Sequence, residues 1–140
     1  MKLRSCFLLK TTATLLFILI NMQNNSLAHD TSNDLKSNWT GKDGVNNLED
    51  FKDNQEAQIK AIKEYHKLIW TYLKSYHRFE GQEIAGVKIT KSGMIAAAHL
   101  VGHMNLKRFL KSKGTYVAID GNDKPCTIYL RDFAGYKLEF

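Results

Sequence analysis

Two histidines, His99 and His103, lie four residues apart, the spacing that places two imidazole rings on one face of a helix. Such a pair binds zinc or a related metal when a third ligand lies close by. Gly102 separates them and is expected to end the helix, and no glutamate follows His99 as a zinc protease requires. We therefore expect His99 to be a packed residue hydrogen-bonded to the backbone. A metal site at His99 and His103 is the alternative, and the sequence predicts no cofactor.

The other histidines do not complete such a site. His66 and His77 share a helical face but stand about three turns, or about 16 Å, apart, so they cannot bind one ion. His66 falls within an apolar stripe and is expected to be a hydrogen-bonded core residue. His29 would chelate copper only as an N-terminal residue, and the sequence offers it no partner histidine of known position.

Carboxylic acids are the second chemistry to consider. A peptidoglycan hydrolase needs two carboxylates across the scissile bond, or one acid with a raised pKa in a cleft. Glu80 and Glu83 are the catalytic candidates, in a predicted loop. A lysozyme-like enzyme would carry its acid in a Glu-Ser-Gly string, but Lys91 occupies that position, two residues before Gly93. We therefore favour a non-catalytic domain, with a small hydrolase as the alternative.

A basic cluster is the main candidate for binding. It consists of four residues within seven positions, Lys107, Arg108, Lys111 and Lys113. Such a cluster can contact the anions of teichoic acids, lipids or glycans. The alternative is a solvated helix face without a ligand.

Two further motifs are interpreted as structural. The oxygen-bearing residues Asp120, Asn122 and Asp123 resemble the start of a calcium loop. Lys124 and Pro125 replace the ligand and glycine that the full pattern requires, which favours a simple turn. Cys126 stands beside an apolar segment and has no local signature of a thiol enzyme. We expect it to be a buried small hydrophobic residue, with pairing between chains or a free reactive thiol as alternatives.

The N-terminus has the pattern of a cleavable secretory signal. Lys2 and Arg4 precede a charge-free apolar stretch over 11–22, and the small-residue site Ser26-Leu27-Ala28 follows. The apolar run is shorter than the roughly 20 residues that a spanning helix needs, so a retained anchor is the weaker hypothesis. We expect residues 1–28 to be removed and the protein to be periplasmic or secreted, with no stable membrane anchor after cleavage.

Composition limits what the remaining chain, residues 29–140, can be. Its 112 residues suit one small domain, and its net charge falls from +6 to +3 because the signal holds three basic residues and no acidic one. This charge is too mild to indicate nucleic-acid binding. Cys126 is its only cysteine, so packing without an internal disulfide must stabilise it. The oligomeric state is left open.

Periodicity predicts a flexible lead-in over 29–47 and a helical domain over 48–140. An amphipathic helix over 55–78 begins with Asp53 as its cap and Glu56 as the reciprocal acid. A hairpin-like connector should follow over 81–90, and then two short helices over 90–101 and 105–112. A last helix, capped by Asp123, is expected over 128–133. The predicted fold is all-α or mainly α, a small orthogonal bundle of four to five helices with one long amphipathic helix.

A longer pattern resembles a known module. The string Thr-x-Ser-Gly-Met-Ile-Ala-Ala-Ala-His-Leu-Val-Gly spans 90–102, and Leu-x-x-Phe-Leu follows at 106–110, Asp-x-Asn at 120–122 and Tyr-Leu-x-x-Phe-x-Gly-Tyr at 129–136. These motifs are similar to a small module of bacterial and phage proteins, often near the C-terminus of secreted or cell-wall-associated ones. The resemblance covers about 90 residues.

The resemblance implies a periplasmic or envelope setting and no particular activity. The chain departs from the module at two places. It has His103-Met104 where the module has small residues after the string, and Lys-Pro-Cys at 124–126 where the module usually has a Gly-Thr pair.

Three functional hypotheses result. The first is an exported, non-catalytic domain that binds cell-wall glycan or an envelope protein through its basic cluster and the aromatic residues of the long helix. The second is a small peptidoglycan hydrolase that uses Glu80 or Glu83. The third is a secreted factor directed at a host or a competitor.

Overall fold

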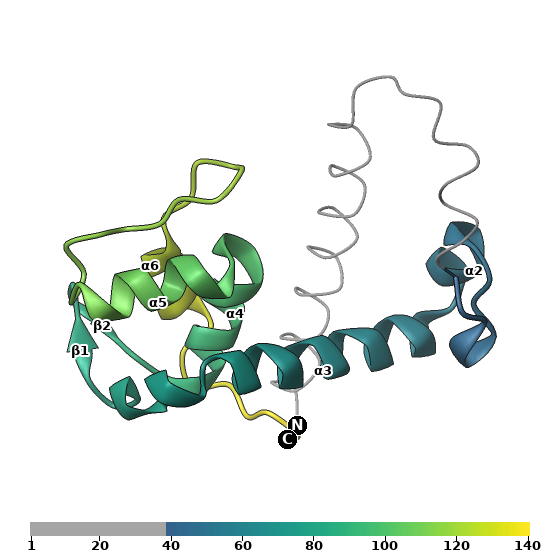
Figure 1. The fold of residues 1–140 in the computed structure, drawn as a ribbon, viewed down its shortest axis with the longest axis horizontal. Coiled ribbons are helices and arrows are strands. Elements are labelled where there is room, and N and C mark those ends of the chain that lie inside the picture. Colours follow the sequence, from purple (N-terminus) through teal and green to yellow (C-terminus); the bar gives the residue numbers. More distant parts are fainter. Residues whose placement is uncertain (1–38) are drawn as a thin grey trace. The chain divides into compact units, whose positions relative to one another are not determined.

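The computed structural model describes residues 39–140 (Figure 1). The predicted signal peptide and residues 29–38 of the predicted lead-in lie outside the described residues. The described chain is mainly helical, which confirms the predicted class. It separates into two compact units, residues 39–64 and 65–140, with the boundary inside one helix. No helix within residues 39–140 combines the length and apolar character needed to span a membrane.

The elements follow one another with short links. The first unit contains the 3₁₀ helix η2 (Lys42–Gly44), helix α2 (Leu48–Asp53) and the start of α3 (Gln55–Tyr72). The second contains the end of α3, the 3₁₀ helix η3 (Lys74–Phe79), strands β1 (Glu83–Ile84) and β2 (Val87–Lys88), and helices α4 (Lys91–Val101), α5 (His103–Lys111) and α6 (Cys126–Asp132).

Helix α3 begins at Gln55, as predicted, but its cap differs by one residue from the prediction. Asn54 caps it, since its Oδ1 accepts a hydrogen bond from the Ala57 N–H at 2.9 Å. The predicted cap, Asp53, is wrong because α2 extends through that residue. The long helix also ends earlier than predicted, at Tyr72, and the chain continues as η3.

Helix α4 forms the centre of the second unit and packs on both α5 and α6. Its residues from Ser92 to Ala98 are all buried, which the three successive alanines permit because small side chains let neighbouring helices approach closely. Thr90 caps α4, since its Oγ1 accepts a hydrogen bond from the Gly93 N–H at 3.1 Å. Helix α5 begins at His103 rather than at the predicted Asn105, directly after Gly102.

The segment before α6 is a turn held by Asp120. Its Oδ1 accepts the N–H groups of Asn122 and Lys124 at 2.8 and 2.9 Å, and the Tyr129 hydroxyl donates to Oδ2. Burial alone would raise the pKa of Asp120, but these hydrogen bonds hold it below its usual value. The carboxylate therefore serves the simple turn predicted here. The predicted cap at Asp123 is wrong, because Pro125 occupies the cap position of α6.

The connector between η3 and α4 is a β-hairpin, as predicted, with Glu83 opposite Lys88 and Ile84 opposite Val87. Its two turn residues, Ala85 and Gly86, both have positive φ, 52° and 73°. Two successive positive φ values define a type I′ turn, which favours Asn-Gly over Ala-Gly. Ala85 therefore holds a conformation that costs an alanine about 1 kcal/mol.

Replacing Ala85 with asparagine should stabilise the protein by about 0.5–1 kcal/mol, because asparagine tolerates the left-handed region better than alanine. The two side chains share the same Cβ position, so no clash arises at that atom. Urea denaturation of A85N beside the parent measures the gain, and A85V, which adds a β-branch at positive φ, should lose stability. An A85N variant less stable than the parent would contradict the turn assignment.

Candidate functional site

The predicted basic cluster lies on and just after α5. The buried face of this helix carries Leu106, Phe109 and Leu110, so its remaining residues face away from the core. Arg108, Lys111 and Lys113 are exposed and Lys107 is half-buried. We call Lys107, Arg108, Lys111 and Lys113 the α5 basic cluster.

Two members of the α5 basic cluster lie over aromatic rings. The Lys107 Nζ stands 5.8 Å from the ring centroid of Tyr76, and the Arg108 Cζ stands 4.1 Å from that of Tyr116. A cation over a ring face is attracted by the ring quadrupole. These contacts hold both cations in place without neutralising their charge.

The surroundings of the α5 basic cluster add positive charge. Helix η3 packs on α5 and contributes Lys74 and Arg78, and neither helix contains an acidic residue. Within the described residues, no ion pair engages these two residues or the α5 basic cluster. Residues 65–140 hold 12 basic and six acidic residues, a net charge of +6. The cluster is therefore available to an anionic partner.

A histidine pair, with His66 buried and His99 half-buried, joins α3 to α4. The His66 Nε2 lies 3.3 Å from the His99 Nδ1, and the ring centroids are 5.5 Å apart, close to the largest value that this nitrogen separation allows. The two nitrogens therefore point at each other, so that one ring donates a hydrogen bond and the other accepts it. Sequence reasoning placed His66 in the core correctly. The prediction that His99 is hydrogen-bonded to the backbone is wrong for its Nδ1, whose partner is the His66 ring.

Burial sets the charge of this pair. His66 is only 2% exposed, and burial together with repulsion from His99 lowers its pKa to about 3. Burial likewise lowers the pKa of His99 to about 4. Both rings are therefore neutral at pH 7, and Tyr65 covers His99 edge-on with ring centroids 5.2 Å apart.

The metal alternative places His99 and His103 together, but the structure gives them different partners. Gly102 ends α4 with φ of 85°, and His103 packs on the Tyr72 ring at 4.7 Å between centroids. Across residues 39–140, no group of three histidine, cysteine or acidic side chains is arranged to hold a metal ion.

Both catalytic candidates, Glu80 and Glu83, are exposed. The Glu80 Oε1 accepts a hydrogen bond from the Lys91 N–H at 3.2 Å, next to the start of α4. Glu83 stands in β1 opposite Lys88. These positions give Glu80 a structural contact and Glu83 a cross-strand neighbour of opposite charge.

Cys126 is fully buried at the start of α6, and burial raises the pKa of its thiol. It is therefore a core residue, as its surroundings in the sequence predict.

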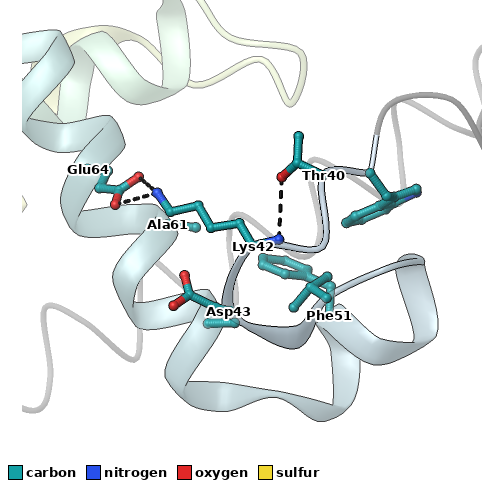
Figure 2. Close-up of a pocket in the computed structure, with 9 residues that line it drawn as sticks. Thr40, Lys42, Asp43, Phe51, Ala61 and Glu64 are labelled. Carbon is teal, nitrogen blue, oxygen red and sulfur yellow. Dashed lines mark hydrogen bonds and ion pairs between the residues drawn. The ribbon is translucent and has the colours of Figure 1, made fainter.

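Sequence reasoning missed a pocket in the first unit (Figure 2). The cavity is about 180 Å³ and lies among nine residues between positions 39 and 64: Trp39, Thr40, Lys42, Asp43, Val45, Phe51, Ala57, Ala61 and Glu64. Five of the nine belong to the stretch predicted as a flexible lead-in. The available signal was Trp39, whose ring packs against Phe51 with centroids 6.5 Å apart.

Comparison with known proteins gives no relative: no family model, curated protein or solved structure matches this chain.

Proposed function

We propose that this chain is an exported, non-catalytic domain of the bacterial envelope that binds an anionic cell-wall polymer through the α5 basic cluster. We also infer that its helices form the predicted orthogonal bundle of four to five. The single observation that carries the functional proposal is the α5 basic cluster itself, four cations on and beside one helix that no carboxylate within residues 39–140 neutralises. The secretory pattern of residues 1–28 supports the envelope setting.

The chemistry of the α5 basic cluster suits a polymer better than a small anion. Each exposed cation contributes little alone, because water and salt screen it. A polymer with repeated negative charges contacts several cations at once and releases its bound counterions, so the contributions add. Phe109, which is fully buried, anchors α5 to the core and so keeps these cations on a fixed surface.

Binding to purified peptidoglycan sacculi, measured by co-sedimentation, tests this proposal. The quadruple variant K107Q/R108Q/K111Q/K113Q should bind about 10–100-fold more weakly, since each cation near an anionic surface contributes up to about 1 kcal/mol. Binding of the parent should weaken steadily as salt rises.

The matched control removes the same charge elsewhere on residues 65–140. Variant K67Q/K88Q/K124Q/K137Q changes four exposed lysines outside α5 and should retain most of the binding. Equal losses in the two variants would reduce the interaction to net charge and reject the α5 basic cluster as the site. Release of soluble muropeptides that disappears in E83Q or E80Q would instead establish the hydrolase.

A further inference from the structure

The pocket in the first unit has the size of a site for one small ring. Its volume of about 180 Å³ lies below the roughly 300–1,000 Å³ typical of pockets for drug-sized ligands. All of its lining residues lie between positions 39 and 64, so η2, α2 and the start of α3 form it.

One part of the pocket lining is apolar. Val45 and Ala57 are buried, with 6% and 5% of their surface exposed, and Ala61 adds a third small side chain. The rings of Trp39 and Phe51 are tilted by 43° to each other. The face of an aromatic ring carries partial negative charge, so it attracts the C–H groups of a saturated ring laid against it.

The polar part of the lining consists of charges that are already paired. The Lys42 Nζ lies 2.7 and 2.8 Å from the two carboxylate oxygens of Glu64, and the Lys60 Nζ lies 3.1 Å from the Asp43 Oδ1. Figure 2 shows the Lys42 side chain extended towards Glu64, with Asp43 beside them. Carboxylates in this state still accept hydrogen bonds from hydroxyl groups, because each oxygen has two lone pairs.

The charge of the unit disfavours an anionic ligand here. Residues 39–64 hold four basic and six acidic residues, whereas residues 65–140 are strongly basic. A ligand with an apolar face, several hydroxyl donors and no net charge satisfies both parts of the lining.

We propose that this pocket binds one neutral sugar ring that carries an N-acetyl group. The ring packs its C–H face on Trp39, its hydroxyls donate to Asp43 and Glu64, and its acetyl methyl group contacts the small apolar side chains. This site is separate in chemistry from the α5 basic cluster and does not depend on it.

Titration of the ¹⁵N-labelled protein with N-acetylglucosamine tests the proposal by NMR. The chain has two tryptophans, Trp39 in the pocket and Trp70, which is stacked on His77 with centroids 3.5 Å apart. Only the Trp39 indole N–H signal should shift, with a dissociation constant on the order of 1 mM, as expected for so small a ligand. Glucose, which lacks the acetyl group, should bind several-fold more weakly.

Tryptophan variants distinguish the loss of sugar stacking on Trp39 from the loss of the fold. W39A should lose the response at backbone signals of Phe51 and Ala57, W39F should retain most of it, and W70F should behave as the parent. The proposal is overturned if the sugar shifts neither indole signal or both equally, if W39A binds as well as the parent, or if inorganic phosphate or tri-lysine shifts Trp39 where the sugar does not. Loss of polymer binding in the quadruple α5 variant with this response intact would show that the two sites act independently.

Discussion

Gly93→Ala should lower the free energy of unfolding by about 2–3 kcal/mol. A Cβ at this position would lie 2.6 Å from the carbonyl oxygen of Leu130, a backbone atom of α6. Backbone cannot move aside as a flexible side chain can, so α4 and α6 must separate. The loss should exceed the gain of about 1 kcal/mol in helix propensity that alanine brings over glycine.

Gly121→Ala is the matched control, because a Cβ there has no atom within 4 Å and the backbone conformation is one that alanine adopts freely. It should leave stability unchanged or raise it by up to about 1 kcal/mol. Urea denaturation followed by circular dichroism measures both variants. If G93A proved as stable as G121A, the close contact between α4 and α6 would be wrong.

Acidification from pH 7 to pH 5 should cost about 2–4 kcal/mol of folding stability through the His66–His99 pair. Burial lowers both pKa values in the folded protein, to about 3 and about 4, from the usual 6.5. As pH falls below about 6.5, the unfolded chain therefore takes up protons that the folded chain does not, and the native state loses stability until the folded pKa values are reached. Urea denaturation at several pH values between 7 and 5 measures this slope.

Substituting one member of the pair tests the assignment. H66Q and H99Q should each reduce the slope of stability against pH by about half, whatever their effect on stability at pH 7. Unchanged slopes in H66Q and H99Q would show that other groups control the acid response.

Local signals in the sequence were sufficient for α4 in the second unit, whereas the start of α5 and the cap of α6 differ from the prediction. Thr90 and the run of alanines predict α4, and Gly102 predicts its end, because capping and backbone freedom act within a few residues. The cap of α3 differs by one residue from the prediction, since Asp53 and Asn54 are both good caps and the extent of α2 decides between them. When two neighbouring residues are equally good helix caps, only the bounds of the adjacent helices decide which of them is the cap.

Two of the three candidate sites join residues that are far apart in the sequence, and these two were not predicted. The α5 basic cluster was visible because its residues are adjacent in the chain. The histidine pair was not, since His66 and His99 lie 33 residues apart and meet only when α3 packs near α4. The pocket was hidden by composition, because polar residues around Gly41 and Gly44 suggested a flexible segment where η2 forms.

The mass of the protein that high salt releases from the envelope fraction of the cells in which it is made shows whether the domain is exported and held to the envelope by charge. We expect a chain that begins at His29 and is released as salt rises. A full-length chain with Met1 still attached and recovered from the cytosol, or a secreted chain that the envelope does not retain, would contradict this expectation.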